Sequence, residues 1–143
     1  MSNGWQPGAG NVHSQPERKE AFMSATEFAI TLDCANAAEL AAFWSQVLGR
    51  PVDPGATGEF AAIGLAGGSD GRPVWMFHKV PETKTAKNRA HVDLITADLA
   101  AEVDRVVRLG ATRLEDLEEN GAKWTTLTDP AGNEFDLMAQ PAG

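Results

Sequence analysis

The chain has 143 residues, and its 12 Lys and Arg against 20 Asp and Glu give a formal net charge of -8. This length suits one domain, or two small modules that share a core. The acidic excess disfavours contact with the phosphate backbone of nucleic acids. A single cysteine excludes an internal disulfide framework and a thiolate-rich zinc site. No apolar run reaches the ~18 residues of a membrane span, and the N-terminus does not have the pattern of a signal peptide. We therefore expect a cytoplasmic protein that binds neither nucleic acid nor membrane.

Residues 1–24 have no hydrophobic periodicity and are rich in Gly, Pro, Asn and Gln, which predicts an extended N-terminal tail. The chain then alternates between strand-like and helix-like patterns. Asn36 suits the N-cap of a helix, and Gly49 suits its C-terminal end. The predicted elements of this half are strands over 28–35, 59–66 and 73–80 and a helix over 38–48.

A basic loop over residues 81–89 separates this half from a second one, in which the pattern restarts. Asp98 suits a second N-cap and Gly110 a second helix end. The sequence DPAGN at 129–133 predicts a turn between the last two strands. The predicted elements of this half are strands over 90–97, 112–119, 123–129 and 134–139 and a helix over 99–109.

The two halves are related by an internal repeat. LITAD at 94–98 follows the pattern of LDCAN at 32–36, and each predicted helix ends in a Leu-Gly pair. A repeat that occurs only twice predicts a pseudo-twofold pair of modules, over residues 25–82 and 83–143. Each sheet would cover its apolar face with its own helix and leave the other face free to curve around a cavity.

Several segments carry a resemblance to a known family: LDCAN with AAFW, then VPETKTAKNRAHVDL, then LGAT, then W-x-x-L-x-DPAGNEF. On these residues the chain, from about Thr26 to Met138, resembles the vicinal oxygen chelate superfamily. That group includes glyoxalase I, bleomycin-resistance proteins and extradiol dioxygenases, and the likeness is strongest to its small glyoxalase-like domain proteins. The resemblance implies an α+β fold, in which two tandem βαβββ modules form a curved mixed sheet around a cavity.

Metal-using members of this superfamily place one ligand on the first strand and one on the last strand of each module. Carried over, these positions hold His91 and Asp136 in the second module. In the first module, the first strand has Ala29, which cannot ligate a metal, and the last strand has His78. The register of His78 is open by one residue, which would turn its side chain to the other face. The resemblance therefore implies a metal set of His91, Asp136 and His78.

The alternation of side chains along each strand predicts, independently of the family, which residues share a face with His91. Val92 and Leu94 suit the core, so His91 and Asp93 share the opposite face, and Asp136 is expected beside them. Two mechanisms remain open. One divalent metal (Fe, Zn, Mn or Ni) would act as a Lewis acid on vicinal substrate oxygens. In a metal-free site the three residues would supply a general acid and base, or a hydrogen-bonded network that only shapes a binding cleft.

Four further residues are candidates for substrate binding. Trp124 and Thr126 share the cavity face of their strand. Trp75 lines either the cavity or the core, and the register of His78 decides which. Arg89 and the other basic residues of its loop either anchor an anionic group of the substrate or are solvated charges.

The favoured function is an enzyme of lyase, isomerase or dioxygenase type that acts on a small oxygen-rich or aromatic organic molecule. The alternative is a non-catalytic protein that binds an antibiotic or metabolite, as bleomycin-resistance relatives do, and the missing ligand at Ala29 favours it. The resemblance also favours a homodimer. It leaves open whether the two modules complete a cavity within one chain or exchange between chains.

Overall fold

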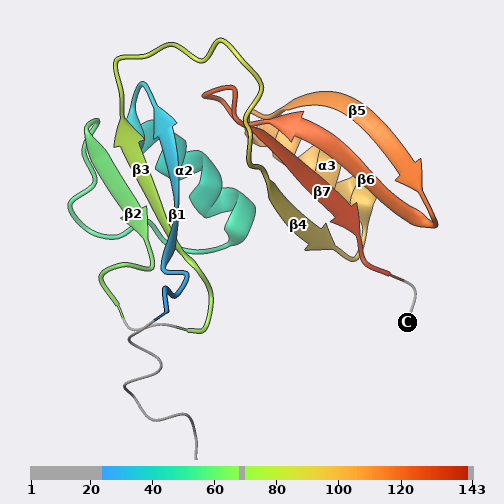
Figure 1. Ribbon diagram of the computed structural model, residues 1–143, viewed down its shortest axis with the longest axis horizontal. Coiled ribbons are helices and arrows are strands. Elements are labelled where there is room, and N and C mark those ends of the chain that lie inside the picture. Colours follow the sequence, from blue (N-terminus) through green and yellow to red (C-terminus); the bar gives the residue numbers. More distant parts are fainter. Residues whose placement is uncertain (1–23, 68–69, 142–143) are drawn as a thin grey trace, which may run out of the picture.

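The computed structural model describes residues 24–67 and 70–141, so the tail expected over 1–24 lies, apart from Ser24, outside the described residues. The chain forms two sheets, each accompanied by one helix (Figure 1). The first module consists of β1 (Ala29–Cys34), α2 (Ala37–Leu48), β2 (Phe60–Ile63) and β3 (Val74–Lys79). The second module consists of β4 (Val92–Thr96), α3 (Leu99–Leu109), β5 (Thr112–Glu119), β6 (Ala122–Thr128) and β7 (Glu134–Ala139).

Both sheets follow the same topology, which confirms the duplicated α+β architecture. The strand orders are β1-β3-β2 and β4-β7-β6-β5, and in each sheet the first strand runs parallel to the last. β1 and β4 are therefore edge strands, and no hydrogen-bonded ladder joins them among the described residues. The expected curved mixed sheet is accordingly present as two separate mixed sheets.

The second module has the four strands expected of a βαβββ unit, whereas the first has three among the described residues. The chain between α2 and β2 is a loop that contains Pro51 and Pro54. Proline lacks the amide that a strand ladder needs. A backbone hydrogen bond of 2.8 Å from the Asp53 amide to the Ala62 carbonyl joins this loop to β2, where a fourth strand would form a ladder. In the described part of the chain, the first module thus has the three strands that its sequence pattern predicts, one fewer than the βαβββ unit that the resemblance implies.

Both helices begin and end where local sequence signals place them. The Asn36 side chain accepts a hydrogen bond from the Glu39 amide, and the Asp98 side chain accepts one from the Ala101 amide, at 3.1 Å each. Gly49 ends α2 with a φ of 64°, a left-handed conformation that glycine adopts without a steric penalty. Helix α2 starts one residue earlier than predicted, at Ala37.

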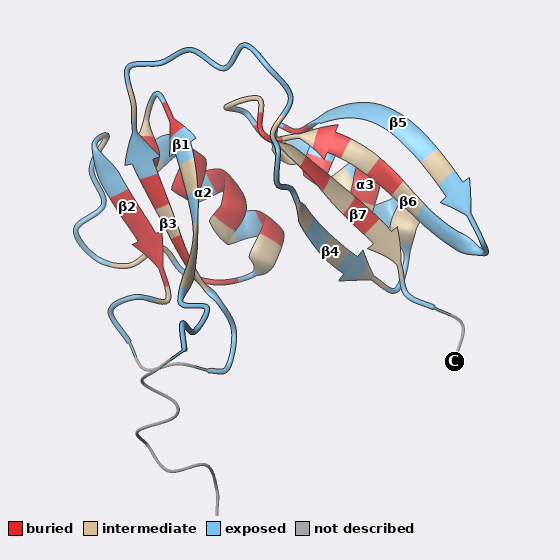
Figure 2. Ribbon diagram, viewed as in Figure 1, coloured by how far each residue is buried: buried red, intermediate tan, exposed pale blue. Residues whose placement is uncertain are grey.

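An aromatic cluster around α2 joins the two modules into one core. The ring centroid of Trp44 lies 4.7 Å from that of Trp75 on β3 and 4.8 Å from that of Phe135 on β7. All three side chains are buried, and Figure 2 shows buried residues on α2 and on the strands that it faces. Helix α2 thus packs against both sheets, and the two modules share their largest buried side chains.

A buried carboxylate reinforces this contact between the modules. Asp129 lies in the β6–β7 turn, is 3% exposed, and accepts a hydrogen bond of 3.0 Å from the indole nitrogen of Trp44. Its other oxygen accepts bonds of 2.9 Å from the amides of Ala131 and Asn133. Burial raises the pKa of Asp129, and the hydrogen bonds from Trp44 and Asn133 oppose that rise. The same carboxylate therefore shapes the turn and fixes it to α2.

A second polar link connects the two helices. Arg105 on α3 donates hydrogen bonds of 2.9 Å to the carbonyls of Gln46 and Val47, in the last turn of α2. These carbonyls have no partner within their own helix, and a cation there also interacts favourably with the helix dipole. Glu102, three residues before Arg105, holds the guanidinium from the other side.

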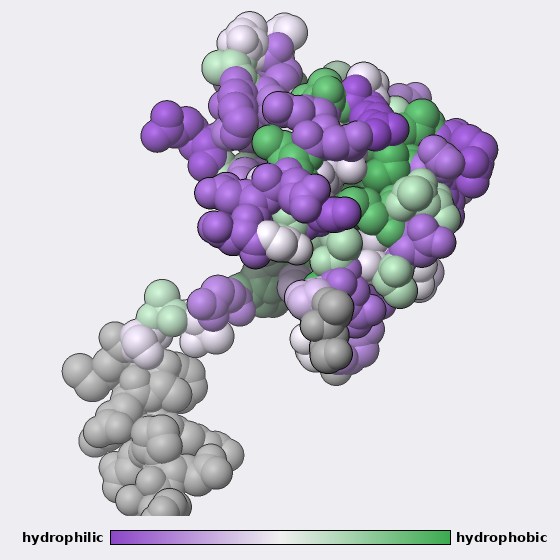
Figure 3. Space-filling model, turned by 90° about the vertical axis from the view of Figure 1, so that its right-hand side faces the viewer, coloured by the Kyte–Doolittle hydropathy of each residue, from purple (hydrophilic) through white to green (hydrophobic). Residues whose placement is uncertain are grey.

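The outer surface of the second module is mostly hydrophilic, with smaller hydrophobic areas between the polar side chains (Figure 3). Neither helix in the described part of the chain combines the length and the apolar character needed to cross a bilayer.

Replacing Trp44 by Phe tests the link at Asp129. The substitution keeps an aromatic ring in the core but leaves a buried carboxylate without one of its donors, so we expect the free energy of unfolding to fall by about 1–3 kcal/mol beyond the loss of ring volume. Urea denaturation measures the change. Trp75→Phe is the control, because it removes the same ring area from the same cluster but has no bond to Asp129. Equal losses in the two variants would contradict a stabilising role for the hydrogen bond.

Candidate functional site

A cleft of about 1310 Å³ lies between the two modules. β1 and the first turn of α2 form one wall, and the start of β4 with the β6–β7 turn forms the other. The crossover segment, which we define as residues 80–91, runs between β3 and β4 and also lines the cleft. The volume exceeds the ~300–1,000 Å³ of most small-molecule sites, so the cleft can take a sizeable ligand.

At the β4 side of this cleft, one imidazole and two carboxylates lie together. His91 Nδ1 is 3.0 Å from Asp93 Oδ1 and 3.5 Å from Asp136 Oδ2. One potential ligand atom from each of the three residues lies within 4.8 Å of the others. His91 also lines the cleft, whereas Asp93 and Asp136 extend from it along the second sheet. We call these three residues the His-Asp-Asp cluster.

The parallel pairing of β4 with β7 produces this cluster. Asp93 and Asp136 are register partners, so their side chains project from the same face of the sheet. On β7 the alternate residues Phe135 and Leu137 are buried in the core. His91 lies two residues before Asp93, just ahead of the strand, and contacts both carboxylates. The opposite face of the same strands packs on α3 and α2, which leaves the His-Asp-Asp cluster on the open face.

The expected neighbours on β6 lie on this face as well. Thr126 is the register partner of Asp136 and donates a hydrogen bond of 2.6 Å to its Oδ1. The other oxygen of Asp136, Oδ2, is the one in contact with His91. Trp124, two residues earlier, is half-buried and pairs with Met138. Asp136 is only 13% exposed, while His91 and Asp93 are 41% and 49% exposed, so the cluster is open to a ligand on one side.

The structure does not bring His78 or Trp75 to the cluster. His78 is exposed on β3, where it pairs with Asp33, and β1 lies between β3 and the second module. His78 is therefore not one of the possible metal ligands, and the third member of that group is Asp93. Trp75 alternates to the other face of β3 and is 3% exposed in the aromatic core. It does not line the cleft.

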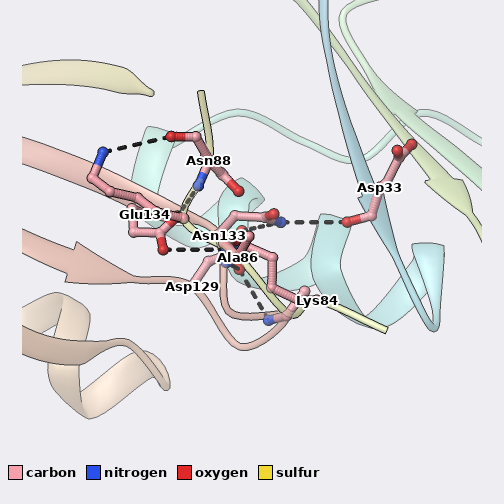
Figure 4. A network of polar contacts seen from close by, with 9 residues as sticks. Asp33, Lys84, Ala86, Asn88, Asp129, Asn133 and Glu134 are labelled. Atoms are coloured by element: carbon pink, nitrogen blue, oxygen red, sulfur yellow. Dashed lines mark hydrogen bonds and ion pairs between the residues drawn. The ribbon is translucent and has the colours of Figure 1, made fainter. Parts of the chain in front are cut away.

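A single carboxylate, that of Glu134 on β7, binds two residues of the crossover segment (Figure 4). Glu134 Oε1 pairs with Lys84 Nζ at 3.2 Å, and Glu134 Oε2 accepts a hydrogen bond of 3.0 Å from the Asn88 amide. Lys84 also donates to the carbonyl of Ala86. No sequence pattern connects Glu134 to this segment, because the two are far apart in the chain.

The electrostatics of Glu134 follow from these contacts. Burial alone would raise the pKa of Glu134, but the hydrogen bond from the Asn88 amide and the pairing with Lys84 outweigh it, and the pKa is lowered. The carboxylate is thus ionised and fully engaged at neutral pH. It fixes the backbone three residues before His91.

A hydrogen bond between the modules and a buried thiol also lie at the cleft. The Asn133 side chain donates to the Asp33 carbonyl at 3.4 Å, which links the β6–β7 turn to β1 (Figure 4). Cys34 lines the cleft but is only 7% exposed, and burial raises the pKa of its thiol. A raised thiol pKa disfavours the nucleophilic thiolate.

Comparison with known proteins gives consistent results. A family model described as a glyoxalase-like domain matches residues 29–138. A glyoxalase/bleomycin resistance protein/dioxygenase family enzyme from Burkholderia phytofirmans has a similar structure, with a TM-score of 0.66 at 15% identity, covering 80% of this chain and 98% of that one. Lactoylglutathione lyase from Agrobacterium tumefaciens has a TM-score of 0.58 at 15% identity, over 81% and 94% of the two chains.

A third similar structure contains a metal. It is a mutant of the fosfomycin resistance protein FosX from Listeria monocytogenes, complexed with Mn(II) and 1S,2S-dihydroxypropylphosphonic acid. Its TM-score is 0.66 at 13% identity, over 83% of this chain and 93% of that one. At these identities the similarity concerns the fold. A search of the curated proteins finds no match.

Stability at acid pH tests the contacts of Glu134. Because its folded-state pKa lies below the ordinary value of 4.5, its contribution is present above that value and is lost as the pH falls through the lowered one. We expect Glu134→Gln to make the free energy of unfolding less dependent on pH in this range, as measured by urea denaturation at successive pH values. Glu59→Gln is the control, because the Glu59–Lys79 pair is solvent-exposed. An unchanged slope in Glu134→Gln would contradict the assignment.

Proposed function

Since this chain belongs to the glyoxalase-like domain family of the vicinal oxygen chelate superfamily, we propose that it is an enzyme of lyase, isomerase or dioxygenase type. Its substrate is a small oxygen-rich organic molecule, which binds in the cleft and reacts beside the His-Asp-Asp cluster. The observation that carries the proposal is the convergence of three donor atoms within 4.8 Å, on the open face of a sheet and at the edge of a cleft.

The donor set suits a divalent cation. One imidazole nitrogen with two carboxylate oxygens is a ligand combination used by Fe(II), Mn(II) and Zn(II). The Thr126 hydroxyl supports this reading, because a hydrogen bond to the second oxygen of a ligating carboxylate fixes its orientation. His91, Asp93 and Asp136 would hold the cation, which when bound supplies Lewis-acid stabilisation of negative charge on substrate oxygens.

The protein side chains also have roles of their own. His91 Nδ1 faces an oxygen of each carboxylate, and these contacts hold the orientation of the imidazole. An imidazole in this setting serves as a general base or acid toward a substrate carbon or oxygen in the cleft. Thr126 keeps Asp136 in place, and Glu134 keeps the backbone before His91 in place.

A second candidate function is binding without catalysis. Ala29 occupies the first-module position at which metal-using relatives have a ligand, and no first-module residue joins the possible metal ligands in the described part of the chain. The cleft is also large for a small substrate. A protein that sequesters an antibiotic or metabolite would need only the cleft, and would retain its ligand affinity without the His-Asp-Asp cluster.

Metal binding tests the favoured function. We expect Mn²⁺ to bind the wild-type protein with one-to-one stoichiometry in isothermal titration calorimetry. Mn²⁺ at 100 times its Kd would stabilise the fold by about 2.7 kcal/mol. Asp136→Asn should weaken Mn²⁺ binding at least about tenfold, because it removes a charged ligand from the half-buried position.

Asp104→Asn is the matched control, since Asp104 is an exposed carboxylate on α3 outside the cluster. It removes the same charge and should leave the affinity unchanged. If neither Mn²⁺ nor Fe²⁺, Zn²⁺ or Ni²⁺ binds the wild-type protein, or if both variants lose affinity equally, the metal-dependent function is wrong and the binding function becomes the better account.

A further inference from the structure

We infer that Arg89 anchors an oxyanion, a carboxylate or a phosphoryl group, of the ligand in the cleft. The ligand is then a small organic acid, whose anionic group lies at Arg89 and whose other oxygens extend toward His91. Only the orientation of the other oxygens toward His91 rests on the proposed function, because binding of an anion at Arg89 needs no metal.

Arg89 is the cation that the cleft leaves available. Lys84 also lines the cleft, but its ammonium group is engaged by Glu134 and by the Ala86 carbonyl. Arg89 makes no hydrogen bond or ion pair with any residue in the described ranges 24–67 and 70–141. In contrast, four other arginines bind carbonyls or carboxylates of the protein: Arg50, Arg72, Arg105 and Arg113.

The backbone that carries Arg89 is fixed. The amide of Asn88, the preceding residue, donates to Glu134, and Lys84 holds the same carboxylate from the other end of the segment (Figure 4). Each oxygen of Glu134 thereby binds a residue of the crossover segment other than Arg89. A guanidinium on an anchored backbone loses less conformational freedom when a ligand binds.

Position and chemistry together define the ligand. Arg89 precedes His91 by two residues and lines the same cleft, so one small molecule can reach both side chains. The planar guanidinium binds carboxylate and phosphoryl oxygens with two parallel hydrogen bonds.

The acidic character of the protein makes this local interaction necessary for an anion to bind. The net charge of -8 repels anions at long range. Carboxylates line the cleft on both sides, with Asp33 and Glu39 on the first-module wall and Glu134 on the second-module wall. Arg89 therefore supplies the local positive charge that attracts the charged end of the ligand.

Nuclear magnetic resonance titration of the metal-free, EDTA-treated protein tests the inference. The probes are glycolate, its uncharged amide glycolamide, and methylphosphonate, and the readouts are the Arg89 side-chain Nε–H signal and the amides of residues 88–91. We expect glycolate or methylphosphonate to shift these signals, glycolamide to leave them unchanged, and the stronger of the two anions to identify the group. Arg89→Gln should weaken binding of that anion about tenfold, as expected for the loss of a charge-assisted hydrogen bond.

Arg108→Gln is the matched control. Arg108 is exposed in the last turn of α3, outside the cleft, and likewise makes no hydrogen bond or ion pair within the described residues. It should leave the affinity unchanged. Equal weakening in both variants, a response to glycolamide equal to that to glycolate, or no response of residues 88–91 to either anion would each overturn the inference. Because the titration contains no metal, it can fail while Mn²⁺ still binds, and it can succeed when Mn²⁺ does not bind.

Discussion

The buried carboxylate of Asp129 joins the two modules, and the positions of the cleft and of the His-Asp-Asp cluster depend on it. One oxygen accepts from Trp44 on α2 and the other organises the β6–β7 turn. Burying a carboxylate is costly unless hydrogen bonds compensate for the lost hydration, and here indole, amide and side-chain donors do so. Because the turn leads directly into β7, fixing it to α2 also fixes Glu134 and Asp136 relative to the first module.

The duplicated modules have diverged in what they contribute. The second module carries the imidazole and both carboxylates, and its β7 supplies Glu134, which holds the crossover segment. The first module contributes a wall of the cleft and most of the aromatic core. In this account the chemistry belongs to one module, and the other module provides support and a binding surface.

Local signals in the sequence were sufficient for the elements, because N-caps, glycine helix ends and strand alternation act within a few residues. Alternation also placed Asp93 and Asp136 on the open face, and the structure brings His91 within 3.5 Å of Asp136, while their chemical roles stay predictions. The positions of His78 and Trp75 relative to the cleft depend on which strand adjoins it, and the strand order within the first sheet is a long-range property. The Trp44–Asp129 and Glu134–Asn88 hydrogen bonds likewise join residues distant in the chain, which no local pattern reveals.

Paramagnetic broadening by substoichiometric Mn²⁺, read from the amide spectrum of the wild-type protein, tests this account most directly. A cation held by the second module alone should broaden the signals of residues 91–93 and 134–138 first and leave those of β2 and β3 sharp. Broadening centred on β3, around His78, would contradict the assignment of the site to the second module.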